Sequence, residues 1–98
     1  MLSPKERANL KAAAHHLRPI HHVGREGVTE ATLNAVAEAF NQRELIKVRL
    51  QQSSPVQARE AGPALVAGLP GVEHVQTIGR TIVLYRQRPA EFASDGGS

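Results

Sequence analysis

The segment that most constrains the fold of this chain is Val23-Gly24-Arg25-Glu26-Gly27-Val28-Thr29, which joins an apolar strand to the start of a helix. Glycines at both ends of the four-residue turn let the backbone bend sharply and let a bulky anion come close. The following helix directs its free N–H groups and the positive end of its dipole at the same turn. Arg25 adds a guanidinium, whose donors suit phosphate. The segment therefore predicts a strand–turn–helix unit that holds a phosphate group.

Helix and strand signals alternate on both sides of this turn. Ser3-Pro4-Lys5-Glu6 is a capping box with proline at the first helical position, and it predicts a helix that ends before Pro19. A brief strand is expected at residues 20–23, and Thr29 is expected to cap a second helix that ends near residues 41–42. Apolar residues recur at helical spacing in two stripes, which are Leu10, Ala13, Ala14 and Leu17, and then Leu33, Val36, Ala37 and Phe40.

The middle of the chain predicts a strand followed by an irregular helix. Residues 45–50 alternate between apolar side chains and the basic Lys47 and Arg49, which is typical of a half-buried strand with a basic outer face. Ser53-Ser54-Pro55 predicts the start of a third helix that runs to about residue 68. Within it, Gly62-Pro63 is expected to cause a kink or a frayed turn.

Two closing strands at residues 72–78 and 81–86, joined by a tight hairpin at Gly79-Arg80, complete an α-β-α-β-α-β-β order. We expect a single α/β domain in which helices cover one face of a four-stranded mixed sheet. Right-handed crossovers place the strand-to-helix turns along one edge, where ligands bind in such sheets. The domain is expected to span residues 1–88, and residues 89–98 are expected to form a disordered tail.

Composition and charge narrow the function further. The 98 residues are 41% hydrophobic and include no cysteine, so the core is small and disulfides do not stabilise it. The N-terminus is charged, and no stretch approaches the roughly 18 apolar residues of a membrane span, so we expect a soluble cytoplasmic protein without a signal peptide. Residues 1–25 and 45–88 are basic, whereas residues 26–44 are acidic. A domain polarised in this way is expected to orient on a polyanion, unless the charges form an ordinary solvated surface.

Five segments in a fixed order and spacing, spanning about residues 2–88, carry a family resemblance. They are Leu2-Ser3-Pro4-Lys5-Glu6-Arg7 with Leu10-Lys11, His15-His16-Leu17-Arg18-Pro19, the segment from Val23 to Thr29, Glu44-Leu45-Ile46-Lys47-Val48-Arg49, and Ile78-Gly79-Arg80-Thr81-Ile82-Val83-Leu84-Tyr85-Arg86. In these segments the chain resembles the YhbY/CRM family of RNA-binding domains. The resemblance implies a fold similar to the C-terminal domain of translation initiation factor 3, with a GxxG loop similar to that of KH domains.

The resemblance also implies a function. Bacterial stand-alone members are associated with precursors of the large ribosomal subunit, and related plant domains act in group II intron splicing. A single copy without a transit peptide resembles the bacterial kind. We therefore predict a monomeric, non-catalytic protein that binds ribosomal RNA in the large-subunit precursor. It is expected to need no cofactor, metal, membrane or small-molecule substrate.

The RNA contacts are expected to involve the backbone and shape of the RNA more than its bases, because the chain has only three aromatic residues. Glu26 departs from the basic or small polar residues usual in the family loop. We expect its carboxylate to turn toward the helix N-terminus, where an acid is favoured. The predicted RNA-binding residues are Gly24, Arg25, Glu26, Gly27, Lys5, Lys11, Arg18, Lys47, Arg49, Arg80 and Arg86.

Other interpretations of these residues stay open. Gly24 and Gly27 are alternatively plain turn glycines, the cations are alternatively solvated charges, and Tyr85 either stacks on a base or packs in the core. The paired histidines at 15–16 and 21–22 lack the partners of a metal site, and they are expected to strengthen RNA binding when they gain charge below about pH 6.5. The turn lacks the lysine of a P-loop, and no serine has a predicted base beside it. The alternative functions are a protein-interaction adaptor that uses the acidic second helix and an intron-splicing type of RNA cofactor.

Overall fold

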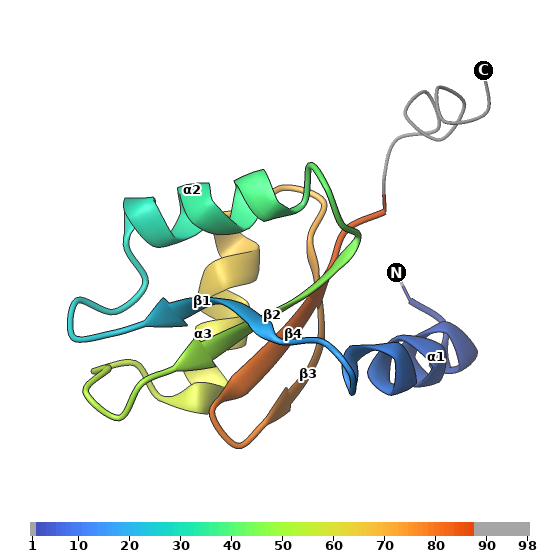
Figure 1. Cartoon of the computed structure of the whole chain (residues 1–98), viewed down its shortest axis with the longest axis horizontal. Coiled ribbons are helices and arrows are strands. Elements are labelled where there is room, and N and C mark those ends of the chain that lie inside the picture. The colour runs from blue at the N-terminus through green and yellow to red at the C-terminus, as the bar shows by residue number, and fades with distance from the viewer. Residues whose placement is uncertain (1, 88–98) are drawn as a thin grey trace.

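Residues 2–87, which a computed structural model describes, form three helices and four strands in the predicted order (Figure 1). The tail expected at residues 89–98 lies outside the described residues. The elements are α1 (Pro4–Ala14), β1 (Pro19–Val23), α2 (Glu30–Ala39), β2 (Leu45–Leu50), α3 (Ala58–Ala67), β3 (Glu73–Ile78) and β4 (Thr81–Tyr85).

The first two helices begin at the predicted caps. The Ser3 hydroxyl accepts a hydrogen bond from the Glu6 N–H at 3.1 Å, and the Glu6 carboxylate accepts one from the Ser3 N–H at 3.0 Å. These bonds with Ser3 lower the pKa of Glu6 below its ordinary value, because they favour the ionised carboxylate. Thr29 and Thr32 form the equivalent reciprocal pair at the start of α2, with both distances at 3.2 Å. Each cap satisfies two N–H groups that the helix leaves unpaired.

The third helix differs from the prediction at its start. It begins at Ala58, because the Ser54 hydroxyl accepts a hydrogen bond from the Val56 N–H at 3.2 Å and stabilises a turn instead of a helix. At the true start, the Gln57 N–H donates to the Glu60 carboxylate at 3.4 Å. The helix then continues through Pro63 without a frayed turn, since the flanking Ala61 and Leu65 are fully buried against the sheet.

The four strands form one mixed sheet, as predicted, and their order in it is β1-β2-β4-β3. β1 and β2 are parallel and are connected through α2, whereas β4 runs antiparallel to both β2 and β3. The register of β3 against β4 shifts between His74 and Gln76, so both His74 and Val75 lie at an irregularity of this edge strand. β4 lies between β2 and β3, so it connects the parallel pair of β1 and β2 to the edge strand β3.

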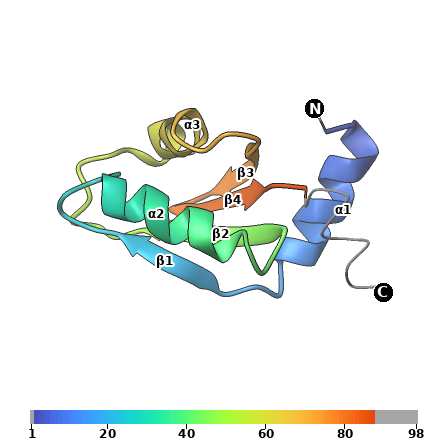
Figure 2. The ribbon, with the colours of Figure 1, turned by 90° about the horizontal axis from the view of Figure 1, so that it is seen from above.

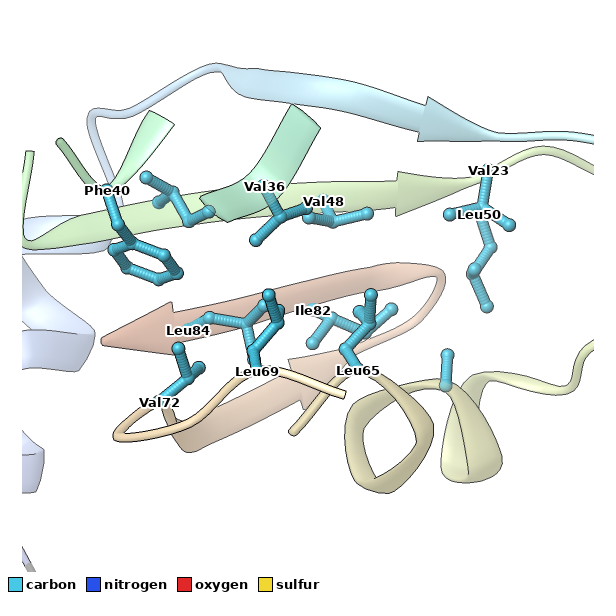
Figure 3. Close-up of a cluster of buried hydrophobic side chains, with 12 residues drawn as sticks. Val23, Val36, Phe40, Val48, Leu50, Leu65, Leu69, Val72, Ile82 and Leu84 are labelled. Atoms are coloured by element: carbon cyan, nitrogen blue, oxygen red, sulfur yellow. The ribbon is translucent and has the colours of Figure 1, made fainter. Parts of the chain in front are cut away.

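The main core lies between one face of the sheet and helices α2 and α3 (Figure 3). Ile46, Val48 and Leu50 of β2 point into it, which confirms the alternation predicted for this strand. The remaining buried members come from the neighbouring strands, the two helices and the turn after α3, and they are Val23, Val36, Phe40, Ala61, Leu65, Leu69, Val72, Ile82 and Leu84.

Helix α1 packs on the opposite face, so the prediction that the helices cover a single face is wrong. Ala14 forms a second cluster with Val75 and Val83, which lie on the side of the sheet away from α2 and α3. Figures 1 and 2 show α1 beside one end of the sheet, apart from the other two helices. The predicted α1 stripe is also wrong at Ala13, which is exposed, whereas Arg7 is half-buried against β3.

Candidate nucleic-acid interface

Three connecting segments lie at the end of the sheet where β1 and β2 end; in Figure 1 the connections after β1 and β2 are at the left, and the hairpin between β3 and β4 is at the bottom. Because β1 and β2 are parallel, their carboxyl ends share one edge of the sheet, and the antiparallel β4 begins there. The Gln51 N–H donates to the Val23 carbonyl at 2.8 Å, and the Leu50 N–H donates to the Arg80 carbonyl at 2.7 Å. These bonds bring together the segments 24–27, 51–57 and 79–80, which we call the loop edge.

The GREG turn, residues 24–27, is a tight turn closed by a hydrogen bond from the Gly27 N–H to the Gly24 carbonyl at 3.0 Å. Gly27 is buried and has a φ of 74°, a conformation that side chains other than glycine adopt at a cost. A Cβ there would also lie 3.1 Å from Val56 Cγ2. The turn itself therefore requires Gly27. Gly24 is less constrained, because a Cβ there would meet only the end of the Gln51 side chain.

Between its two glycines the turn exposes both Arg25 and Glu26. A hollow of about 420 Å³ lies next to them, and its walls include His21, Ala31 and Thr32 from β1 and the first turn of α2. The reciprocal pair of Thr29 and Thr32 caps the N-terminus of α2. The exposed guanidinium and the positive end of the helix dipole favour an anion in this hollow, whereas the Glu26 carboxylate, which is also part of its wall, opposes one.

Two more of the predicted cations lie near the GREG turn. Arg49 is exposed near the end of β2, where it pairs with His22 of β1 and Thr81 of β4. Arg80 is exposed at the tip of the β3–β4 hairpin. With Arg25, these side chains come from three neighbouring strands or their ends. They place three guanidinium groups in or directly beside the loop edge.

The other predicted cations lie elsewhere or have a structural role. Lys5, Lys11 and Arg18 are exposed on α1 and its exit, which lie at the other end of the sheet from the GREG turn (Figure 1). The Lys47 ammonium donates to the Leu17 carbonyl at 3.1 Å and fastens the exit of α1 to β2. The Arg86 guanidinium lies 5.2 Å from the centre of the Phe40 ring, a cation–π contact over the main core.

The sequence profile of the CRS1/YhbY (CRM) domain matches residues 2–86, nearly all of the described chain. The chain belongs to the CRM domain family. The Bacillus subtilis protein named "Probable RNA-binding protein YqeI" is 44% identical over 87 residues, which cover 89% of this chain and 90% of that relative. A Haemophilus influenzae protein named "RNA-binding protein" is 39% identical over 92 residues, which cover 94% and 90% of the two chains.

The CRM fold is also that of a solved structure, the hypothetical protein SAV1595 from Staphylococcus aureus. The two structures align with a TM-score of 0.76 and 32% sequence identity, over 91% of this chain and 92% of the other. This likeness confirms the predicted α/β class and the four-stranded mixed sheet.

Arg7 of this CRM domain has a structural role that sequence reasoning missed. Its guanidinium donates to the backbone carbonyls of His74 and Val75, at 2.9 and 2.5 Å, and so fastens α1 to the irregular edge of β3. A signal for this role was present in the sequence, because Arg7 precedes Leu10 and Ala14 by three and seven residues and therefore lies on the same helical face.

The histidines of the CRM domain lie in different surroundings. His21 and His22 line the hollow beside the GREG turn, whereas His15 and His16 pack edge-to-face on each other with ring centres 6.0 Å apart. Within residues 2–87, no three histidine or acidic side chains are placed to hold a metal ion together. His74 shares a hydrogen bond of 2.7 Å with the Thr77 hydroxyl. Burial lowers the pKa of His74, and the positive charge of Arg7 lowers it further. A backbone hydrogen bond with Gln76 acts in the opposite direction and raises it.

Tyr85 lies far from the GREG turn and packs against the second cluster beneath α1. Burial raises the pKa of its phenol, and the carboxylates of Glu44, Glu6 and Glu73 raise it further. A side chain among three acids is poorly placed to meet a nucleic acid. Across residues 2–87, no helix has both the length and the apolar character needed to cross a membrane.

Proposed function

We propose that this CRM domain is a non-catalytic RNA-binding protein whose loop edge contacts the RNA backbone. The observation that carries the proposal is the exposed Arg25 in the GREG turn, beside the N-terminal end of α2. The helix dipole and the guanidinium both favour an anion at that point. The B. subtilis relative is named as a probable RNA-binding protein and the H. influenzae relative as an RNA-binding protein, and these names support RNA as the source of that anion.

In this mechanism the GREG turn holds one phosphate and the other loop-edge cations hold its neighbours. Arg49 and Arg80 contact adjacent phosphates along the RNA, since they lie near the end of β2 and the start of β4, the next two strands of the sheet after β1. Such contacts fix the position of the RNA and carry little sequence information. The cations on α1 lie at the other end of the sheet and cannot contact the same phosphates. They contact phosphates of a longer RNA that extends along the domain.

The RNA we propose is ribosomal RNA in a precursor of the large subunit, bound in the cytoplasm by a monomer. The resemblance to bacterial stand-alone CRM proteins supports this part of the proposal. Relatives of nearly the same length in B. subtilis and H. influenzae also support a protein built around a single domain.

The first experiment compares two single variants that remove the same charge. Arg25→Ala changes the loop edge, whereas Arg43→Ala removes an exposed arginine at the other end of the sheet that has no part in the proposed contacts. Affinity for a structured ribosomal RNA fragment is measured over a range of salt concentrations. We expect the Arg25 variant to bind more weakly and to lose about 0.7–0.9 from the slope of log K against log salt, because one phosphate contact is gone. Equal losses in both variants would refute a defined loop edge.

The second experiment tests the ribosomal target. Tagged protein from a cell lysate is sedimented on a sucrose gradient at low and high salt, with a nuclease-treated control. Nuclease-sensitive protein just above the position of the mature large subunit in the gradient, removed by high salt, is the expected result. Protein that stays at the top of the gradient at every salt concentration would remove the ribosomal claim but not RNA binding itself.

A further inference from the structure

A second hollow, of about 470 Å³, lies on the other side of the loop edge, between the 51–57 segment and the β3–β4 hairpin. Its polar walls are the side chains of Gln51, Gln52 and Gln57, together with Arg80. Pro55 and Val56 contribute apolar surface. Its volume lies within the roughly 300–1,000 Å³ of pockets that take small ligands. We call it the glutamine pocket.

The walls of the glutamine pocket are held in place by hydrogen bonds within the domain. The Ser54 N–H donates to the Gln51 carbonyl at 3.0 Å, and the Val56 N–H donates to the Ser54 hydroxyl at 3.2 Å. The bond from the Leu50 N–H to the Arg80 carbonyl fixes the hairpin against the end of β2. These bonds fix the backbone of the walls, so only the exposed glutamine and arginine side chains have to be ordered when a ligand enters.

The glutamine pocket and the GREG turn share a wall. Gln51 Oε1 lies 2.9 Å from the position of a Cβ on Gly24, and Val56 Cγ2 lies 3.1 Å from that of a Cβ on Gly27. The same two side chains line the pocket. A nucleotide whose phosphate lies on the GREG turn therefore has the pocket within its immediate surroundings.

We propose that the glutamine pocket takes the base of an unpaired RNA nucleotide next to the phosphate on the GREG turn. This inference rests on the proposed RNA-binding function. Each glutamine amide both donates and accepts hydrogen bonds, which matches the edge of a base. The apolar surface of Pro55 and Val56 suits the face of the ring, and an arginine plane such as that of Arg80 stacks on bases. A base inside an A-form duplex is stacked and paired, so only an unpaired nucleotide can enter.

The test compares a fully paired RNA duplex with the same duplex carrying a three-nucleotide bulge. Binding to each is measured at one low salt concentration by fluorescence anisotropy. The pocket variant is Gln52→Ala with Gln57→Ala, and the matched control is Gln42→Ala with Gln87→Ala, because all four glutamines are exposed. Thermal unfolding of both variants is compared with the wild type, and we expect it to be unchanged.

We expect the wild-type protein and the control to bind the bulged RNA about tenfold more tightly than the duplex, a factor typical of one good amide–base contact. In the pocket variant this preference should disappear while affinity for the duplex stays within twofold. The proposal is overturned if the wild type binds both RNAs equally, if the pocket variant keeps the preference, or if it loses affinity for both RNAs alike. A wild type that binds neither RNA refutes the proposed function as well, whereas equal binding of both RNAs refutes only the pocket.

Discussion

We expect the substitution Gly62→Ala to destabilise the wild-type protein but to stabilise a variant that lacks the His74 ring. Gly62 lies inside α3, where alanine is ordinarily better than glycine by about 1 kcal/mol. A Cβ at Gly62 would, however, lie 2.8 Å from Nε2 of His74 and 2.9 Å from two ring carbons. The ring has little freedom to move, because its Nε2 is hydrogen-bonded to the Thr77 hydroxyl at 2.7 Å. Gly62→Ala should therefore overpack the contact between α3 and β3.

The magnitude follows from two opposing contributions. Overpacking a well-packed contact costs about 1–3 kcal/mol, against the gain of about 1 kcal/mol from helix propensity. We expect Gly62→Ala to lower the free energy of unfolding by about 1 kcal/mol in the wild-type background. In a His74→Ala background the clash is absent, and the same substitution should raise the free energy of unfolding by up to about 1 kcal/mol. The coupling between the two positions is then about 2 kcal/mol, within the range found for residues in contact.

Urea unfolding of the wild type, both single variants and the double variant measures this coupling directly. The measurements are made at pH 8, so that the histidine is neutral in the folded and the unfolded chain. The reasoning is refuted if Gly62→Ala has the same sign in both backgrounds. A stabilisation in both would mean that the ring moves aside freely, and a destabilisation in both would mean that the methyl group meets the helix surroundings rather than His74.

Three further predictions concern the turn, the pH and the docking of α1. Gly27→Ala should lower the free energy of unfolding by at least about 1–2 kcal/mol, because its φ of 74° is costly for alanine; an unchanged urea midpoint would contradict this. Because the pKa of His74 is lowered on folding, the unfolded chain binds the proton more readily. Stability should therefore fall as the pH drops below about 6.5, and less so in a His74→Gln variant. Arg7→Ala removes two charged hydrogen bonds and should cost about 1.5–3 kcal/mol. Amide hydrogen exchange should then rise in α1 first, and uniform exchange along the chain would argue against a local role.

Much of the fold followed from local patterns in the sequence. The alternation in residues 45–50 placed Ile46, Val48 and Leu50 in the core, because side chains of a strand alternate between its faces. Ser3 and Thr29 marked true helix starts, since their hydroxyls bond to N–H groups only three residues away. Such short-range signals need no knowledge of the tertiary structure.

The errors arose where the same local signal fits two structures. The Ser-Pro pattern at residues 53–55 suits a helix cap and a turn equally, and the hydrogen bond from the Val56 N–H to the Ser54 hydroxyl stabilises the turn. The apolar stripe of α1 shows that one side of the helix packs, but not on which face of the sheet. Only the location of Val75 and Val83 on the second face decides that.

The candidate site was predictable in part. The strand-to-helix turns, and with them the GREG turn, were expected along one edge of the sheet, whereas the proximity of Arg49 and Arg80 to that turn follows from the observed pairing of β1, β2 and β4. Whether a cation is free depends on side-chain contacts that the sequence does not encode locally. Lys47 bonds to a carbonyl thirty residues away, and Arg86 covers an aromatic ring.

The central position of β4 has a consequence for how this chain is made. β4 is the last strand described, yet it separates β2 from β3 in the sheet and is the only neighbour of β3. During synthesis β2 is complete well before β4, its antiparallel partner, leaves the ribosome. Until residues 81–85 emerge, β2 therefore lacks one of its two neighbouring strands. When two strands so far apart in the sequence pair, the chain loses loop-closure entropy before the contacts of the complete sheet compensate for that loss. A nascent chain that stops before residue 81 therefore lacks the strand that completes the core, and folding is decided within the last few residues of the domain to be translated.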